Sequence, residues 1–329
     1  MTVRGPLQSE TIVRREAEHI TFDSLLLENI GTYGVRLAGN HCTVQNCVIR
    51  WTAPNSDGVA VQIKVQRAPN VGNRVLDNEI YDCNDGVGVT WDQNGEDPFM
   101  ECVGLLVEGN DIYLTEIRRT DDGAYGLAEN GIDVKAGPRT QTDPIRFVRN
   151  RIWGFRRSAP GAGSGSIGSA VTIHRAAQRI LFAQNVIVDC PVAFQEVRRD
   201  ADPEDPEQGP REITLRSNIV SMMRRYNIDD LGAVLRTKLS FEVQGNWFSH
   251  SATLSALPKL GPDDTFVGNV LYRTPFGAAP DTDWQPDNAG GNVTATDEQM
   301  CDVLVERRRW TRRGVVRLES AVRVGDALF

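Results

Sequence analysis

The sequence lacks the features that mark several large classes of protein. No run of about 18 apolar residues is present, so we expect no membrane-spanning segment. The first residues, MTVRGPLQSE, include no apolar stretch typical of a signal peptide, and we expect none there. Basic residues are the minority, 36 against 44 acidic residues, and the net charge of −8 disfavours nucleic acid as a partner. Phosphate-loop, GxSxG, HExxH and CxxC motifs are absent, which removes support for nucleotide, serine-hydrolase and zinc chemistry.

Six cysteines are present, and their spacing argues against a disulfide framework. Cys83 and Cys190 each lie five residues after a recurring asparagine, three repeats apart. In stacked repeats their separation would be roughly 14 Å, too far for a disulfide. We therefore expect mostly free, buried thiols.

What the sequence does contain is an asparagine that recurs within an apolar frame. The residues three before and two after it are apolar at fifteen of sixteen positions, and the spacing between repeats is 23 to 40 residues, as in a solenoid. The flanking apolar residues alternate with a period of two, which indicates strands. The eight asparagines are Asn46, Asn78, Asn110, Asn150, Asn185, Asn218, Asn246 and Asn269.

This pattern predicts an all-β fold, a right-handed parallel β-helix solenoid of about nine coils with an Asn ladder running along it. We expect a single domain over residues 1–329. Within it, residues 1–18 form an N-terminal edge or cap, 19–272 the coils and 273–329 a C-terminal cap. A monomer or a weak oligomer is expected, because caps protect the exposed strand edges.

A second strand in each coil begins near a small residue or a proline, and its outward side chains are candidates for function. Aligning these strands at that residue predicts two outward rows. The first row is Ala60, Gly88, Asp133, Thr172, Ala193 and Val234, and the second is Gln62, Thr90, Lys135, His174, Gln195 and Arg236. Lys135 then lies between Thr90 and His174, and Asp133 shares its face. A solvated strand face is the alternative for these residues.

Long loops leave the coils on both sides of these rows, at 91–102, 115–130, 155–168 and 198–211. Loops on a rigid scaffold often carry function. We expect them to bring further charged residues close to Lys135, namely Glu129, Asp121, Asp122, Arg156, Arg157 and Arg175.

The segments ENGIDVKAG (129–137), IRFVRNRIWGF (145–155) and AVTIHR (170–175), together with the repeated asparagine turns, resemble the right-handed parallel β-helix (pectate-lyase-like) superfamily. The resemblance covers residues 19–272. It implies a carbohydrate-active enzyme of the polysaccharide-lyase type, which cleaves an acidic polysaccharide or oligosaccharide by calcium-assisted β-elimination. It also implies an extracellular or periplasmic location.

The resemblance implies roles for particular residues, although no family-specific motif is matched. Lys135 is the expected base, with His174 and Arg175 as its catalytic neighbours, and a nearby cation would lower its pKa into a useful range. The expected Ca²⁺ ligands are Asp133, Glu129, Asp121 and Asp122. The expected substrate-binding residues are Arg156, Arg157, Thr90, Gln195, Arg236 and Trp91.

Three alternatives stay open at this point. A uronate epimerase would share the first proton transfer. A glycoside hydrolase would use paired carboxylates drawn from Asp121, Asp122, Asp133 and Asp85. A non-catalytic carbohydrate-binding or structural β-helix would instead show an aromatic groove, for which Trp91, Trp153 and Tyr125 are the candidates.

Overall fold

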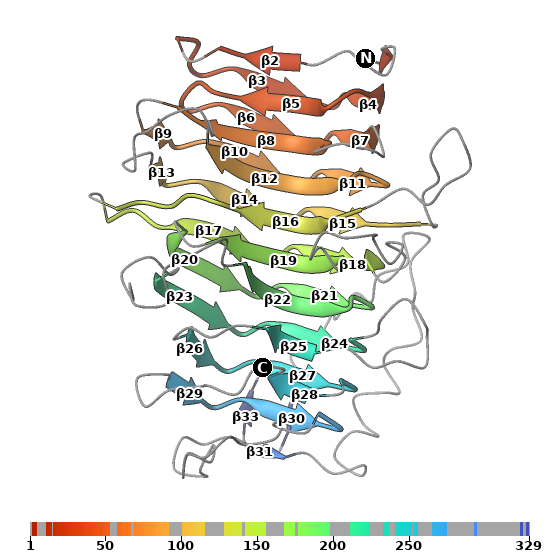
Figure 1. The fold of residues 1–329 in the computed structure, drawn as a ribbon, viewed down its shortest axis with the longest axis vertical. Coiled ribbons are helices and arrows are strands. Elements are labelled where there is room, and N and C mark those ends of the chain that lie inside the picture. The colour runs from red at the N-terminus through yellow and green to blue at the C-terminus, as the bar shows by residue number, and fades with distance from the viewer. Residues whose placement is uncertain are drawn as a thin grey trace.

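The computed structural model shows a parallel β-helix, in which every regular element of the described part of the chain is a strand (Figure 1). Parallel strands stack in three long sheets along the molecule. The structure describes residues 2–4, 11–14, 16–52, 58–66, 69–91, 101–115, 128–139, 142–155, 168–174, 177–197, 211–223, 233–236, 241–251, 253–255, 265–274, 293–294, 323–324 and 327–328. The predicted fold class is confirmed.

Sheet A has eleven strands, and it includes two that lie outside the predicted coil range. Its strands, in spatial order, are β1 (Thr2–Arg4), β4 (Leu26–Ile30), β7 (Val48–Thr52), β11 (Glu79–Tyr81), β15 (Asp111–Tyr113), β18 (Arg151–Trp153), β21 (Val186–Val188), β24 (Ile219–Ser221), β27 (Trp247–Ser249), β30 (Val270–Tyr272) and β31 (Val293–Thr294).

Sheets B and C have nine strands each. Sheet B contains β2 (Thr11–Val13), β5 (Tyr33–Leu37), β8 (Val59–Val65), β12 (Asp85–Trp91), β16 (Asn130–Val134), β19 (Ser169–His174), β22 (Val192–Val197), β25 (Ala233–Arg236) and β28 (Thr253–Ser255). Sheet C contains β3 (Thr21–Asp23), β6 (Thr43–Gln45), β10 (Arg74–Leu76), β14 (Leu106–Glu108), β17 (Ile145–Val148), β20 (Gln178–Ala183), β23 (Arg211–Arg216), β26 (Phe241–Gln244) and β29 (Thr265–Val267).

Two short pairs complete the description: β9 (Asn70–Val71) with β13 (Cys102–Val103), and β32 (Arg323–Val324) with β33 (Ala327–Leu328). No helix in the described residues is long and apolar enough to cross a membrane. The described cysteines are buried thiols outside any disulfide, as predicted: Cys42, Cys47, Cys83, Cys102 and Cys190.

The core consists of side chains stacked in register from coil to coil. Val107 pairs with Phe147, and Phe147 with Phe182, whose rings stack at 4.9 Å. Ile112 and Ile152 pair in the same way on sheet A. All five side chains are at most 1% exposed. Period-two alternation of apolar residues therefore produces a continuous interior, because each inward side chain meets its equivalents in the adjacent coils.

The recurring asparagines form a hydrogen-bonded ladder between sheets C and A. Each Nδ2 donates to the Oδ1 of the next asparagine, at 2.9 to 3.1 Å, from Asn78 to Asn269. The same amides also donate to backbone carbonyls, as Asn110 does to Val75. Burial of these polar side chains is tolerated because their donors and acceptors are paired.

Asn46 does not belong to this ladder, which corrects one of the eight predicted positions. Val75 pairs with Val44 and Ile80 with Ile49, so the interior position of this coil is Cys47. Cys47 donates its backbone N–H to Asn78 Oδ1. Asn46 is exposed, with a positive φ of 53°, at the turn position that precedes the ladder.

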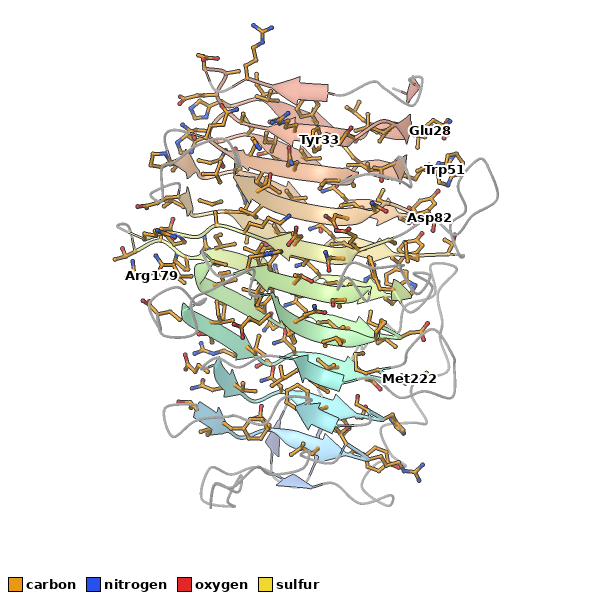
Figure 2. The ribbon with its side chains drawn as sticks, in the orientation of Figure 1. Glu28, Tyr33, Trp51, Asp82, Arg179 and Met222 are labelled. Atoms are coloured by element: carbon orange, nitrogen blue, oxygen red, sulfur yellow. The ribbon has the colours of Figure 1, made fainter. Side chains whose placement is uncertain are left out.

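A second set of turn residues with positive φ lies between sheets A and B. Figure 2 shows three of them on the same side of the molecule, Trp51, Asp82 and Met222, with φ between 52° and 61°. Arg179 lies on the opposite side. The left-handed residues at these corners turn the chain from sheet A toward sheet B.

The register of sheet B differs from the predicted alignment at two steps between neighbouring coils, from β8 to β12 and from β19 to β22. Val61 pairs with Val87, and Gln62 with Gly88. Phe194 pairs with Val171, and Gln195 with Thr172. Both differences are shifts of two residues.

A close approach between coils fixes the true register. A β-carbon at Gly86 would lie 2.5 Å from the carbonyl oxygen of Gly131, and one at Gly131 would lie 2.7 Å from that of Ala170. Small residues are therefore required at this corner, and Ala60 and Ala193 supply them in their coils. The predicted alignment used Gly58 and Pro191 instead.

Candidate functional site

The outward side of sheet B carries a row of polar residues that run from coil to coil through Asp133. Gln62 and Gly88 precede Asp133, and Thr172 and Gln195 follow it. Arg236 pairs with Gln195, so it belongs to this row rather than to the row of Lys135 and His174. The polar side chains Gln62, Asp133, Thr172 and Gln195 are all at most 6% exposed. A solvated strand face does not have this burial.

Asp133 lies at the centre of a charged cluster with Lys135 and His174. Its Oδ2 is 2.8 Å from Lys135 Nζ, and its Oδ1 is 2.8 Å from His174 Nε2. Lys135 follows Val134, whose partner Ile173 precedes His174, so the two side chains are neighbours on adjacent strands. The structure therefore brings together the three residues that the sequence placed side by side, and Thr90 lies in the same row as Lys135.

The cluster determines the charge of Asp133. Burial alone would raise the pKa of this carboxyl, but its interactions with His174 and Lys135 outweigh burial and hold the pKa below its usual range. Asp133 is therefore an ionised carboxylate that is 2% exposed.

Asp85 lies on the adjacent strand β12 and behaves in the opposite way. Burial, followed by the negative charges of Asp133 and Glu129, raises the pKa of Asp85 well above its usual value. Asp85 is 5% exposed and therefore retains its proton over a wider pH range than an ordinary aspartate. Two carboxyl groups of contrasting protonation thus share one face.

Asn130 fixes the orientation of the Asp85 carboxyl group. Its backbone N–H and its Nδ2 both donate to Asp85 Oδ1, at 3.0 and 3.2 Å. Thr172 Oγ1 donates to Asn130 Oδ1, which orients the amide. Because both donors from Asn130 point to Oδ1, the proton of the neutral acid is directed to Oδ2.

The pKa of Lys135 shifts in the direction opposite to the one that the expected role as a base requires. Burial would lower the pKa of Lys135, but the negative charges of Asp133, Asp85 and Glu129 raise it overall. The ammonium form is therefore stabilised, whereas a general base needs a lowered pKa.

The remaining predicted site residues fall into two groups. Glu129 is described, and its charge influences Asp85 and Lys135. The others lie outside the described residues or have side chains that are not described: Asp121, Asp122, Tyr125, Arg156, Arg157 and Arg175 in the first case, Trp91 and Arg236 in the second.

The described residues do not fit a calcium site. Asp133 Oδ2 faces the Lys135 ammonium and Asp133 Oδ1 faces His174 Nε2, at 2.8 Å each, rather than an open ligand position. In the part of the chain that is described, no three His, Cys, Asp or Glu residues form a group that could hold a metal. With Asp121 and Asp122 outside that part, calcium stays a prediction, and no step is routed through it below.

Trp153 lies away from this site, on the outer side of sheet A. Its ring stacks on Tyr113 at 4.1 Å, and Tyr113 stacks on Tyr81 at 5.2 Å. These rings follow the register of β11, β15 and β18. The stack joins neighbouring coils, and Trp153 does not line the face that carries Asp133.

Comparisons with known proteins found similarity to solved structures at a low level. No family model and no curated protein matches the chain. The solved structures similar to it include two of the catalytic domain of a GH87 α-1,3-glucanase, each an aspartate-to-alanine variant in complex with tetrasaccharides. The identities are 10% and 11%, and the TM-scores are 0.27 and 0.24. Each match covers 85% of this chain and 60% of the other.

Sequence reasoning missed Asn130 as a member of the site, and it placed Gln62 and Thr172 in the outward rows without giving either residue a role. Asn130 carried a signal, since it lies three residues before Asp133 in ENGIDVK. To place Gln62 beside Gly88 from the sequence, the alignment would have had to use Ala60 as the small residue of its coil. The contact between Thr172 and Asn130 depends on the pairing of β16 with β19.

Proposed function

We propose that this protein is a carbohydrate-active enzyme that hydrolyses glycosidic bonds, with Asp85 as the general acid and Asp133 as the ionised carboxylate. The observation that carries the proposal is a pair of buried aspartates on adjacent strands of sheet B with contrasting partners. Asp133 contacts Lys135 and His174, whereas Asp85 accepts hydrogen bonds from Asn130, and their pKa values shift in opposite directions. Glycoside hydrolysis requires this combination, a carboxylic acid that keeps its proton beside a carboxylate that has lost it.

Each group then has a defined task. Asp85 Oδ2 gives its proton to the glycosidic oxygen as the bond to the anomeric carbon breaks. Asp133 accepts a proton from the water molecule that attacks the anomeric carbon. Lys135 and His174 hold Asp133 in place and keep it ionised.

The strand register indicates the stereochemical course. Asp85 pairs with Asn130, three residues before Asp133, so the two α-carbons are roughly 11 Å apart by strand geometry, and the side chains can approach more closely. Carboxyl groups about 6.5 to 9.5 Å apart leave room for a water molecule and give inversion, whereas about 5 to 5.5 Å gives retention. We therefore expect inversion at the anomeric carbon, which ¹H NMR of the first product would show.

The test is a screen of neutral and acidic polysaccharides for new reducing ends. We expect Asp85→Asn and Asp133→Asn each to lower kcat at least a hundredfold, the scale of a lost acid or base. Glu129→Gln is the matched control, because it removes a neighbouring charge but neither proposed catalytic group. Full activity in Asp85→Asn would refute the assignment.

A second candidate is supported by the shared contacts of Asp133 with Lys135 and His174. In elimination or epimerisation of a uronate, His174 would remove the proton next to the carboxylate, and the Lys135 ammonium would neutralise that carboxylate. The raised pKa of Lys135 favours this neutralising role over the role of base.

The two candidates differ in their products and in the variants that affect them. Elimination yields an unsaturated sugar that absorbs in the ultraviolet, and it would be lost in His174→Gln but kept in Asp85→Asn. Hydrolysis yields new reducing ends without that absorption, and it would be lost in Asp85→Asn; in His174→Gln it would be reduced but kept, because Lys135 still contacts Asp133. Calcium belongs to the elimination route, where loss of activity in chelator and recovery with calcium would support it. An extracellular or periplasmic location also stays a prediction.

A further inference from the structure

Gly88 leaves a position without a side chain directly beside Asp133. It pairs with Gln62 in the preceding coil and with Asp133 in the following one. A β-carbon at Gly88 would lie 3.1 Å from Val59 Cγ1 and 3.7 Å from Thr90 Cγ2. Methyl groups of Val59 and Thr90 therefore pack over Gly88, next to the ionised carboxylate, where the row has no polar side chain.

Two buried oxygen atoms beside this position have no hydrogen-bond partner among the described residues. They are Gln62 Oε1 and Thr90 Oγ1, and Gln62 is 3% exposed. A buried polar atom normally has a partner, because leaving it unpaired sacrifices the free energy of its hydration. Gln195, in the same row, follows this rule, since its Oε1 accepts a hydrogen bond from Ser169 Oγ at 2.6 Å.

We propose that Gln62 and Thr90, on either side of Gly88, form a hydroxyl-binding subsite that holds a pyranose ring against the Asp85–Asp133 pair. The subsite rests on the proposed function and adds the residues that recognise the sugar. A hydroxyl group both donates and accepts, so it satisfies either end of the Gln62 amide as well as Thr90 Oγ1. The methyl groups of Val59 and Thr90 contact the C–H groups of the ring.

The two unpaired atoms set the chemical class of the ligand. Gln62 and Thr90 belong to adjacent strands and lie two residues apart along the register, because Gln62 pairs with Gly88. Their α-carbons are therefore roughly 8 Å apart by strand geometry, a span that neighbouring hydroxyl groups bridge with a hydrogen bond at each end. The ligand is thus a pyranose with two neighbouring hydroxyl groups.

The test measures binding without turnover. The intact protein is titrated with the methyl glycosides of glucose, galactose, mannose and xylose, and the melting temperature is followed. At least one glycoside should raise the melting temperature of the unmodified protein. In Gln62→Leu the affinity should fall about tenfold, the scale of one lost hydrogen bond. The melting temperature of the ligand-free variant should stay the same or rise, because an unpaired buried oxygen has been removed.

Gln195→Leu is the matched control. It removes an amide from the same row, but one whose oxygen is already paired with Ser169. Its ligand-free melting temperature should fall, because Ser169 loses its acceptor. This opposite pattern separates a ligand-binding residue from a structural one.

Three results would overturn the subsite: no response to any glycoside, an unchanged affinity in Gln62→Leu, or a loss of stability in Gln62→Leu as large as in Gln195→Leu. The last result would mean that ordered water pairs with Gln62 as part of the fold. Binding that depends on Gln62 without any hydrolysis would retain the subsite and refute the proposed function. Hydrolysis with an unchanged KM in Gln62→Leu would retain the proposed function and refute the subsite.

Discussion

At the scale of single residues, the site is defined by how burial and partners shift the charges of similar groups in opposite directions. Asp85 and Asp133 are both aspartates on one face, and both are almost fully buried. Asp133 contacts Lys135 and His174, which both lower its pKa, whereas the charged neighbours that raise the pKa of Asp85 are acidic. The environment therefore gives one residue type two chemical roles.

The raised pKa of Asp85 predicts a cost in stability that increases with pH. As the pH rises above about 4, an unfolded aspartate loses its proton while folded Asp85 keeps it, so the folded state loses stability relative to the unfolded state. Asp85→Asn removes this cost and keeps an oxygen that can accept from Asn130. Unfolding in urea at a series of pH values should show the variant gaining stability over the unmodified protein toward neutral pH.

Asp133→Asn provides the opposite-sign control. The pKa of Asp133 is lowered, so its ionised form stabilises the fold above the usual pKa, and this contribution is lost as the pH falls through the lowered value. The Asn variant should therefore be less stable than the unmodified protein at neutral pH, and the difference should shrink in acid. If both variants shift stability in the same direction at neutral pH, the assignment of charges is wrong.

At the scale of strands and turns, alternation and repeat spacing predicted the fold, and the small errors have a common physical origin. Shifting a strand by two residues keeps the same side chains facing inward. The alternation of apolar and polar residues therefore could not show that Gln62 pairs with Gly88. The close approach of backbones at Gly86 and Gly131 fixes that register. In VQNCVI both Asn46 and Cys47 sit in an apolar frame, and only the pairing of Val44 with Val75 distinguishes them.

Part of the site followed from the same patterns. Asp133 and Lys135 share a strand face by alternation, and the strand of His174 was aligned correctly with theirs, so their proximity was predictable. Their roles were not predictable, because the pKa of Lys135 depends on its burial and on the charge of Asp85. The alternation of residues along the strands does not show either effect.

The ladder predicts a large difference between two asparagines. Asn150 is fully buried, accepts from Asn110 and donates to Asn185. Asn150→Ala leaves several buried groups unpaired and should cost about 3 kcal/mol in the free energy of unfolding. Asn46→Ala should cost about 1 kcal/mol, mainly because alanine is disfavoured at its positive φ.

Urea unfolding of the two variants checks this difference. Equal losses of stability would mean that the ladder contributes no more than an exposed turn residue, and they would contradict the correction that places Cys47 rather than Asn46 in the interior.

At the scale of the whole molecule, the stacked coils hold side chains that are distant in sequence at regular separations. Asp85, Asp133 and His174 come from three successive strands of sheet B, β12, β16 and β19 (Figure 1). Each coil packs mainly on its neighbours, so the scaffold holds these groups at fixed steps along one face. The function proposed here depends on that spacing and on the contrast in charge that it creates.

The most direct test of the account is the infrared absorption of the intact protein at neutral pH, in the region where a protonated carboxylic acid absorbs. We predict a band from the C=O stretch of protonated Asp85 that disappears in Asp85→Asn and persists in Asp133→Asn. Absence of the band at neutral pH, or its loss in Asp133→Asn but not in Asp85→Asn, would contradict the account.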